Sequence, residues 1–567
     1  MSKGRFDLEE TLFEGCHYSN AGPTPPHRCM LAQNMYTQGD GAWHSRPGWN
    51  LRGEGSLTDT EEAQCIGAFW VSGVPVYFAI VDGEIWGSAS MDSGWTKRVT
   101  SANLSAAPGG SINVGTNSTL FWTPFMDTVV ITGGSDVFTW DGTTGAAGLT
   151  LLSNAPTFVY GKAAVYYGKL FFIVGDGSPV IPSYSIAWSE EFQPNVGYEA
   201  GGYNNAWDLK QTSQVPIYSL VATNEALYYF RSIGIGRITG RVTTDFQTTG
   251  VHDTVSTSHG CAAPEGAIYL DGDIWFVDDA RPKVLIDGEV VVDLSPQMWG
   301  VTENSWPGWF TNRNITEDII GARWEQLTMR PVICYEANTN CVLVWNDTNA
   351  SGPRELTTPM VYRADNYAFQ GFWQSLSTIK VTAVGAAHYS TSGILTPILM
   401  LGLDDGQAGY GWINPVRAGV WGNDDIDGTL RTVPRRIIGP RQRWKTGRAF
   451  TVRKVTAELA VPQKSDLLEV DVQLITPNYS VGDTVPPGNN QAVTINCGDG
   501  RLATNVGPRI IQVDVEPDRG RWFQLDMLFE MQNSGGTPYA TTKSTSGALW
   551  GWTLHCEELG DIDPAEA

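Results

Sequence analysis

The stretch VPVYFAIV at residues 74–81, followed at once by DGEIW at 82–86, is typical of the whole chain. Apolar residues recur at every second position or in short runs, and Gly, Asp, Asn or Pro ends each run. This pattern indicates short β-strands joined by tight turns. Helical periodicity is nearly absent, so the sequence predicts an all-β protein.

Similar corners, in which Asp or Asn leads into a short strand with Trp or Phe, return at residues 136–142, 271–276 and 340–345. We interpret them as equivalent hairpins of a repeated unit. Units can be drawn at irregular spacings of roughly 45 to 65 residues, the period of four-stranded propeller blades. The pattern predicts a β-propeller of about six to eight blades over residues 51–430. The alternative is a string of unrelated β-sandwiches.

The two ends of the chain read differently from its centre. Residues 1–50 contain several prolines and no clear periodicity, which predicts an extended N-terminal arm. Beyond residue 430, long alternating stretches at 454–461, 468–474, 510–515 and 549–554 predict an antiparallel β-sandwich over residues 431–567, with one solvent-exposed face.

The formal net charge of −23 argues against nucleic-acid binding or adhesion to anionic membranes as the main activity. The eight cysteines are dispersed, which predicts buried thiols. The first residues lack an apolar signal region, and no apolar stretch reaches membrane-spanning length, residues 393–403 coming nearest. We therefore expect a chain that folds in a cytoplasm and has no membrane anchor.

Standard catalytic and nucleotide-binding motifs are missing from the sequence. It has seven histidines, and those outside the N-terminal arm are far apart. These observations predict a protein that is not an enzyme and needs no cofactor. Within the arm, four N/S ligands could form a tetrahedral zinc site, although their spacing matches no zinc finger: Cys16, His17, His27 and Cys29. Buried thiols and interface imidazoles are the favoured interpretation.

Two acidic segments invite other hypotheses. Residues 423–428 have oxygen ligands and a glycine where an EF-hand loop has them, but position 12 is Pro434, so a solvated acidic turn is favoured over a calcium site. Residues 90–96 resemble the Asp-box of sialidase-type propellers, in which the Asp fixes a turn, so the likeness is structural.

For the cysteines and the aromatic residues, a structural role competes with a functional one. If residues 337–338 form the centre of a turn, Cys334 and Cys341 face each other across a hairpin, where we favour two reduced thiols over a disulfide. The 22 Trp and 20 Tyr residues could stack on sugars, but packing between strands is favoured.

Several segments together suggest a family. The first group of segments begins with IAWS at residues 186–189, continues through a polar stretch to Trp207, and ends with predicted strands at 217–220 and 226–240. Nearer the start of the sequence lie NMY at 34–36 and RPG at 46–48. In these segments the sequence resembles the tail nozzle proteins of short-tailed, podovirus-like bacteriophages. The motif-level likeness covers about 90 residues, and the Asp-Gly step common before the central strand pair is replaced here by TSQVP at 212–216.

The resemblance implies a virion structural protein of the phage tail, folded in the host cytoplasm. It implies a homohexameric ring below the portal and the adaptor ring that supports tail fibres or spikes. Double-stranded genomic DNA would pass through this ring during ejection without specific binding. The alternative is a glycan-binding or sialidase-like propeller, acting as a receptor-binding spike or a hydrolase.

A basic segment follows residue 428, because residues 429–457 include no acidic side chain. Arginine can form paired hydrogen bonds with carboxylates of a neighbouring subunit or of the adaptor. A solvated basic loop and a DNA-gripping constriction remain alternatives. The candidate interface residues, called the basic segment below, are Arg431, Arg435, Arg436, Arg441, Arg443 and Lys445.

Overall fold

The structure is a computed structural model of the chain. Apart from helix α1 (Ser101–Ser105) and the 3-10 turn η1 (Ala146–Gly148), the regular elements that it describes are β-strands, so the predicted all-β class is confirmed. No helix in this part of the chain is long and apolar enough to cross a membrane. The described residues are 5–16, 27–29, 31–46, 49–51, 62–90, 94–114, 119–196, 205–209, 215–240, 251–278, 281–294, 330–347, 354–356, 358–373, 380–391, 394–404, 408–411, 420–421, 423–424, 431–432, 435–440, 442–443, 449–460, 467–475, 490–496, 508–514, 519–520, 522–532, 545–546 and 548–558.

The described residues form seven antiparallel blades of four strands each. The first blade is β8 (Ala63–Val71), β9 (Val74–Val81), β10 (Glu84–Ser88) and β11 (Thr96–Val99). The second is β12 (Phe121–Phe125), β13 (Thr128–Thr132), β14 (Phe138–Trp140) and β15 (Leu149–Leu151). The third is β16 (Val159–Tyr166), β17 (Lys169–Gly175), β18 (Pro182–Trp188) and β19 (Ala206–Asp208).

The remaining blades continue in chain order, except for the last strand. The fourth is β20 (Ile217–Ala222), β21 (Ala226–Arg231), β22 (Ile235–Thr239) and β23 (Val251–Ser256). The fifth is β24 (Ala267–Leu270), β25 (Asp273–Asp278), β26 (Arg281–Ile286) and β27 (Val290–Asp293). The sixth is β28 (Pro331–Glu336), β29 (Cys341–Asn346), β30 (Met360–Arg363) and β31 (Phe369–Phe372). The seventh is β32 (Val381–Thr391), β33 (Ile394–Leu403), β34 (Ala408–Gly411) and β7 (Trp49–Leu51).

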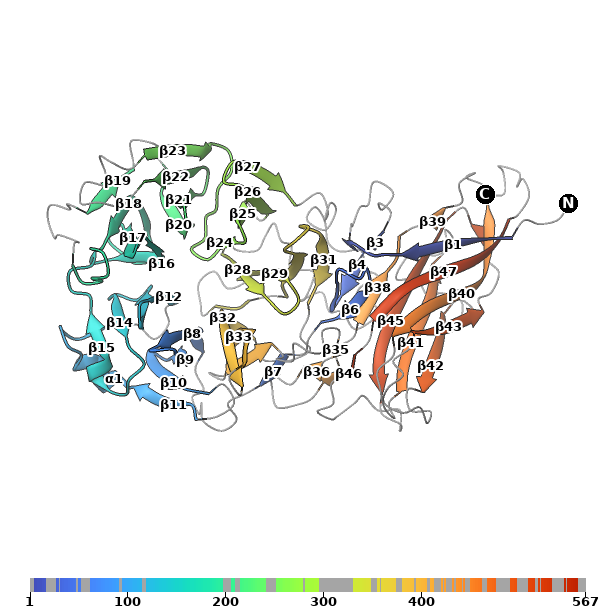
Figure 1. Ribbon diagram of the computed structural model, residues 1–567, viewed down its shortest axis with the longest axis horizontal. Helices are drawn as coiled ribbons and strands as arrows, with labels where there is room; N and C mark the ends of the chain where they lie inside the picture. The colour runs from blue at the N-terminus through green and yellow to red at the C-terminus, as the bar shows by residue number, and fades with distance from the viewer. Residues whose placement is uncertain are drawn as a thin grey trace.

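The seven blades close into a ring, seen from one end in Figure 1. The first strand of each blade lies innermost and contacts the first strand of the next, and β32 of the seventh blade packs against β8 of the first. Strand β7, from near the N-terminus, pairs with β34 and completes the seventh blade. The predicted β-propeller is thus confirmed, and its seven blades fall within the expected range.

Tight turns between the strands explain the recurrent Asp, Asn and Gly. Asp82, Asp271, Asp287 and Asn340 all have φ near +50°, a left-handed conformation that Asp and Asn tolerate better than most residues. The first three are each followed by a glycine, also at positive φ. Short polar side chains at these points therefore allow the chain to reverse every few residues.

The recurrent aromatic corners are not equivalent, contrary to the sequence interpretation. Those at residues 82–86 and 136–142 begin between the second and third strands of a blade. Those at 271–276 and 340–345 join the first strand to the second. Any turn between two half-buried strands favours the same residue types, so local composition marked the turns but not their positions within the blade.

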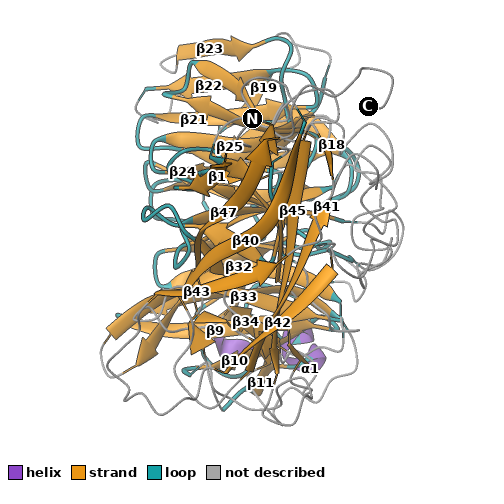
Figure 2. Ribbon diagram, turned by 90° about the vertical axis from the view of Figure 1, so that its right-hand side faces the viewer, coloured by secondary structure: helices purple, strands orange, loops and turns teal. Residues whose placement is uncertain are grey.

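The C-terminal region is a sandwich of two sheets, as predicted. One sheet contains β40 (Phe450–Ala460), β43 (Pro508–Asp514), β44 (Arg519–Gly520) and β47 (Ala548–Glu558). The other contains β38 (Arg435–Ile438), β39 (Gln442–Arg443), β41 (Leu467–Ile475), β42 (Asn490–Asn496) and β45 (Trp522–Gln532). Figure 2 shows several of these long strands in front of the ring. Small pairs also form between β35 (Val420–Trp421) and β46 (Thr545–Ser546), and between β36 (Asn423–Asp424) and β37 (Arg431–Thr432).

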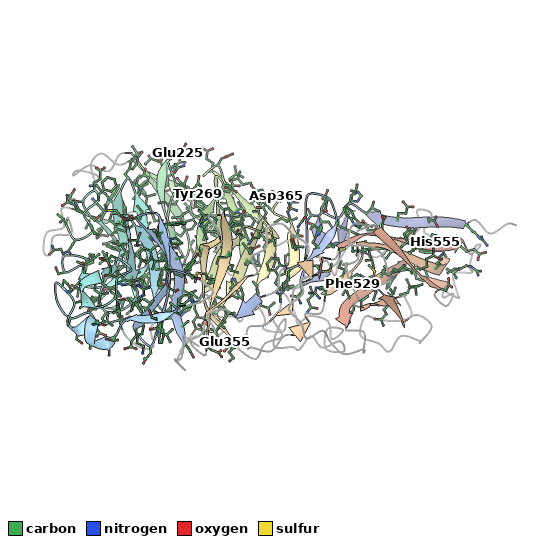
Figure 3. All side chains as sticks on the ribbon, turned by 60° about the horizontal axis from the view of Figure 1, so that its bottom comes forward. Glu225, Tyr269, Glu355, Asp365, Phe529 and His555 are labelled. Carbon is green, nitrogen blue, oxygen red and sulfur yellow. The ribbon has the colours of Figure 1, made fainter. Side chains whose placement is uncertain are left out.

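Alternating burial confirms the predicted exposed face of the sandwich. Along β43, Ile511 and Val513 are buried whereas Ile510, Gln512 and Asp514 are exposed. The buried members meet side chains of the opposite sheet in one core, among them Val470, Met527 and Phe529 (Figure 3 labels Phe529).

The N-terminal residues supply strands to both parts of the molecule. β1 (Arg5–Thr11) pairs with β47 of the sandwich, and so does β6 (Trp43–Ser45), which in turn pairs with β5 (Met35–Thr37). β4 (Leu31–Gln33) lies between β31 of the sixth blade, to which it is parallel, and β38 of the sandwich. A short parallel pair, β2 (Gly15–Cys16) and β3 (Arg28–Cys29), precedes β4.

Through β4, the sixth blade and one sandwich sheet become a single ten-stranded sheet. Its apolar core is equally continuous, since one cluster includes Trp275 and Tyr362 of the propeller, Met35 of the N-terminal segment, and Val455 of the sandwich. The propeller and the sandwich are thus joined through backbone pairing and shared burial rather than through a linker alone.

Candidate functional site

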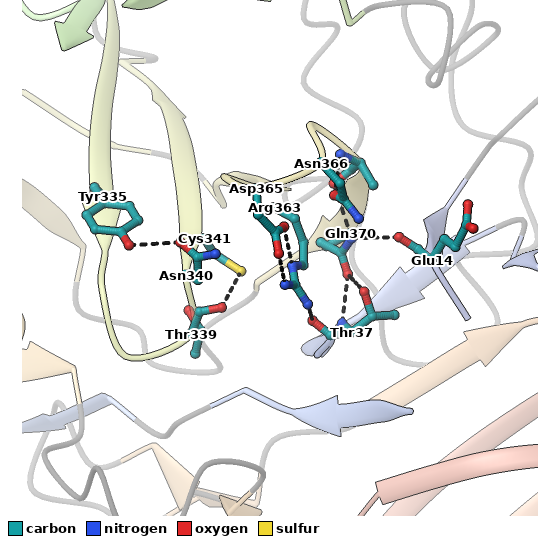
Figure 4. Close-up of polar contacts among 11 residues, drawn as sticks. Glu14, Thr37, Tyr335, Thr339, Asn340, Cys341, Arg363, Asp365, Asn366 and Gln370 are labelled. Atoms are coloured by element: carbon teal, nitrogen blue, oxygen red, sulfur yellow. Dashed lines mark hydrogen bonds and ion pairs between the residues drawn. The ribbon is translucent and has the colours of Figure 1, made fainter. Parts of the chain in front are cut away.

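A buried polar junction joins the N-terminal segment to the sixth blade (Figure 4). The Gln370 Oε1 atom accepts hydrogen bonds from the Thr37 N–H at 2.7 Å and from the Thr37 hydroxyl at 2.9 Å. The Arg363 Nη1 donates to the Thr37 carbonyl at 2.6 Å, and the Arg363 guanidinium also pairs with Asp365. Thr37, Arg363 and Gln370 are buried, so these bonds fix the segment in place.

Close backbone approach is the second feature of this junction. Gly371 has φ of +101°, and a Cβ atom added there would lie 1.9 Å from the Ala32 carbonyl oxygen of β4. Only glycine fits both the left-handed backbone and this contact. Sequence analysis missed this junction. Nothing near residue 371 indicates that a strand about 340 residues earlier in the sequence packs against it.

The two N-terminal motifs of the resemblance contact each other beside this junction. The Arg46 Nε donates to the Asn34 Oδ1 at 2.9 Å, and the Arg46 N–H donates to the Asn34 carbonyl at 3.0 Å. Both residues are almost completely buried. The Asn34 N–H donates to the carbonyl of Phe372 in the sixth blade. These residues therefore hold the frame of the protein together.

The later motif residues are also internal to the propeller. Trp188 is fully buried at the end of β18 and stacks on Phe171, with ring centroids 5.8 Å apart. The buried Ser189 hydroxyl accepts a hydrogen bond from the Leu170 N–H and donates to the Glu190 carbonyl. The Arg231 side chain, also buried, donates to the Leu209 carbonyl at 3.0 Å. In this chain the motif residues thus have structural roles.

The basic segment is divided between the interior and the surface. Arg435 lies on β38 and is fully buried, so it is not part of an exposed patch of the single chain. Arg443, on β39, is exposed. Arg431 and Arg436 belong to β37 and β38, while Arg441 and Lys445 lie outside the described residues. An interface role stays a prediction for the members other than Arg435.

The zinc hypothesis gains no support from the described ligands. Cys16 and Cys29 lie side by side on β2 and β3, and both side chains are buried. The exposed His27 ring instead has its Nδ1 2.9 Å from the Thr11 carbonyl oxygen. His17 lies outside the described residues, among which no group of three or more His, Cys, Asp or Glu side chains is arranged to hold a metal.

The two acidic segments are only partly described. In the calcium-like segment, residues 423–424 form β36, whereas 425–428 lie outside the described residues. The Asp-box-like segment connects β10 to β11, the third and fourth strands of the first blade, and its Trp95 is buried. Its Asp92 also lies outside the described part of the chain.

Cys334 and Cys341 do not face each other across the hairpin, because its turn is not centred on residues 337–338. The hairpin register places Cys341 opposite Glu336 and Cys334 opposite Leu343, because the turn occupies residues 337–340. Both are free, buried thiols, as favoured from the sequence, and burial raises the pKa of each to about 12. Such thiols are poor nucleophiles at neutral pH.

Tryptophan side chains mainly serve packing, as the sequence favoured. Among the tryptophans whose side chains are described, only Trp550 is exposed. Seven are fully buried: Trp43, Trp95, Trp140, Trp188, Trp275, Trp345 and Trp373.

Comparisons with known proteins give no closer identification. No family model matches the chain, and no curated protein matches it significantly. Similar solved structures include PorZ, a surface component of the type-IX secretion system of Porphyromonas gingivalis, at 10% identity and a TM-score of 0.37, covering 71% of this chain and 44% of that one. Another is the extracellular domain of BT4673 from B. thetaiotaomicron, at 8% identity and a TM-score of 0.34, covering 64% and 40%. This chain spans less than half the length of either structure. TM-scores this low do not establish a shared fold, so the fold assignment rests on the strand pairing of this chain.

Proposed function

We propose that this chain is a virion structural protein, a subunit of a tail nozzle ring of the kind found in short-tailed phages. The observation that carries the proposal is the continuous sheet and core joining the sixth blade, the N-terminal segment and the sandwich. A subunit that must keep its position between an adaptor and fibres during DNA ejection benefits from such a rigid connection. The family resemblance supplies the identity of the assembly.

The placement of the motif residues supports the same proposal. Asn34, Arg46, Trp188 and Ser189 are buried members of the frame. A resemblance carried by framework residues concerns the shape of a subunit rather than a reaction. In this proposal the protein is no enzyme, uses no cofactor and acts in the virion tail.

Charge is compatible with DNA passage through a homohexamer. Each copy has a formal net charge of −23, so a channel wall with the average charge of the chain would repel phosphates. Each phosphate contact with Lys or Arg adds affinity and would slow transit. We place the exposed Arg443 at a contact with a neighbouring subunit or the adaptor, away from the channel.

Electron microscopy of the purified chain, alone and with its adaptor ring, tests this function. The expected result is a six-fold ring with an open axial channel, whose subunits match the propeller and sandwich. A protein that stays monomeric with the adaptor and occurs as a single copy per particle would contradict the proposal. Release of sugar from a glycan, abolished by replacing one propeller carboxylate, would support the glycan-active alternative instead.

A further inference from the structure

Lys162 lies on a β-bulge in the innermost strand of the third blade. The register of β16 against β17 shifts around it, and Gly161 has φ of +67°. The bulge is fixed by the second blade, because the Thr132 hydroxyl donates to the Gly161 carbonyl at 2.7 Å and the Thr123 hydroxyl donates to the Ala163 carbonyl at 2.8 Å. Bulges held in this way redirect a side chain, here the lysine.

The neighbours of the Lys162 ammonium come from two other blades. Its Nζ lies 5.7 Å from the centroid of the Trp122 ring, which belongs to β12 of the second blade. Its electrostatic partner is Glu265, which precedes β24 of the fifth blade. A lysine that reaches groups of the second and fifth blades from the third must lie on the inner side of the ring.

The ammonium is surrounded by protein but remains accessible. The Lys162 side chain is exposed to solvent, yet desolvation by the nearby protein lowers its pKa, an effect that Glu265 partly opposes. Within the described part of the chain, it forms no ion pair and no hydrogen bond through its side chain. The positive charge therefore lacks a close counter-ion there.

Trp122 provides a fixed, half-buried aromatic surface beside this charge. Its ring lies against Gly67 of the first blade, where an added Cβ atom would come within 2.3 Å of the ring. The ring also makes an edge contact with Phe78, at a centroid distance of 5.5 Å. Because glycine and phenylalanine hold it, the indole is preorganised rather than free to rotate.

The Glu265 carboxylate is already engaged by another cation. Its Oε2 lies 2.6 Å from the Arg354 Nη2, and both side chains are largely buried. The formal charges of Lys162, Arg354 and Glu265 sum to +1, in a chain whose total is strongly negative. A local positive charge is suited to an anion of matching charge, and the neighbouring indole offers an apolar contact to the rest of such a ligand.

A second lysine that lies over a tryptophan, Lys97, also has a carboxylate partner. The Lys97 Nζ lies 5.1 Å from the Trp86 ring, but Lys97 also forms an ion pair with Glu84. This pair joins neighbouring strands of one blade and is complete without a ligand. The group around Lys162 has the same lysine and indole without the close carboxylate.

We propose that Lys162 and Trp122 form a binding site for a small monocarboxylate ligand with a flat apolar face, such as a hexuronate sugar. The ligand carboxylate would pair with the Lys162 ammonium, as the Glu84 carboxylate pairs with Lys97 in the first blade. The sugar ring would contact the part of the half-buried Trp122 indole that Gly67, Phe78 and the Lys162 ammonium leave exposed. A single net positive charge and the nearby Glu265 favour a monoanion over a dianion such as phosphate. The site is independent of ring assembly.

Competitive amine labelling of the purified chain tests the site directly. The protein is treated with acetic anhydride at neutral pH, with D-glucuronate, D-glucose or inorganic phosphate, and peptide mass spectrometry quantifies Lys162 and Lys97. Glucuronate is expected to slow acetylation of Lys162 but not of Lys97, and glucose to protect neither. Lack of protection by glucuronate, equal protection of both lysines, or stronger protection by phosphate would each overturn the proposal.

Calorimetry with glucuronate on three variants supplies the second test. Lys162→Met is expected to weaken binding by about tenfold or more, since a charge-assisted contact is lost. Lys162→Arg is expected to retain most of the affinity, and Lys97→Met to change it less than about twofold. Unchanged binding by Lys162→Met would overturn the proposal. If that variant fails to fold, the labelling of the unmodified protein still decides the question.

Discussion

The propeller and the sandwich are both antiparallel β-structures, but they are assembled from different parts of the chain. The second blade uses only residues 121–151, and each strand pairs with the next along the chain. In the sandwich, Arg5 pairs with Glu557, so the sheet needs both ends of the protein. Local pairing loses little loop entropy, whereas the sandwich can form fully only after β47 has been synthesised. Most propeller blades are therefore local units, whereas the N-terminal segment completes the seventh blade and joins the propeller to the sandwich.

Deleting residues 1–51 should have the largest effect on this comparison. The deletion removes β1 to β7, and thereby one strand of the seventh blade and the bridge to the sandwich. We expect a lower melting temperature and aggregation, because apolar core surface becomes exposed. Differential scanning calorimetry and light scattering measure both effects. Co-expression of residues 1–51 as a separate chain is expected to restore solubility partly. A truncated protein with an unchanged melting profile would contradict the role given to this segment.

Trp188→Ala tests a contact that is local to the third blade. Removing a fully buried indole stacked on Phe171 should lower the free energy of unfolding by about 3–5 kcal/mol. Denaturant titration measures this loss. Because the blade is a local unit, hydrogen exchange should increase most in β16 to β19 and least in the sandwich. Exposed Trp550→Ala is the matched control, expected within about 1 kcal/mol of the unmodified protein.

Gly371→Ala tests the place where the two regions meet. The substitution adds left-handed backbone strain and a clash with the Ala32 carbonyl, with an expected cost of about 2–4 kcal/mol. In contrast to Trp188→Ala, hydrogen exchange should increase in both β31 and β38. Gly39→Ala is the control, since no atom lies within 4 Å of its added Cβ and its φ is ordinary. Equal stability of the two variants would refute a tight junction.

Glu84→Gln should produce the smallest effect, because it removes a partly exposed ion pair within a single blade. Burial opposes ionisation of Glu84, but the contact with Lys97 and the hydrogen bond from the Ser101 N–H outweigh it and hold the pKa of the carboxyl below its ordinary value. A lowered folded pKa stabilises the protein above the unfolded value near 4.5, and this stabilisation disappears as pH falls through the folded pKa. We expect a loss of less than about 1 kcal/mol at pH 7 and a smaller one in acid, measured by urea titration at both pH values. A loss that grows as the pH falls would contradict this linkage.

The candidate sites could be predicted less well than the elements that surround them. The basic segment was visible as a run without acidic residues, but its Arg435 is buried, which charge patterning alone does not reveal. A single lysine in a strand, such as Lys162, has no sequence signal that distinguishes it from other surface lysines. Its environment depends on a bulge fixed by the second blade and on Glu265 from the fifth, and spacing in the sequence encodes neither contact.

The sequence by itself determined the all-β class, the presence of frequent tight turns, the propeller and the sandwich. These follow from alternation of apolar residues and from the φ angles that Asp, Asn and Gly tolerate, both of which act over a few neighbouring residues. Only the tertiary structure decided that the N-terminal residues join three different sheets and that Asn34 meets Arg46. Pairing between distant strands depends on which edges remain open once the local sheets have formed. That is a property of the assembled molecule, so no local pattern can specify it.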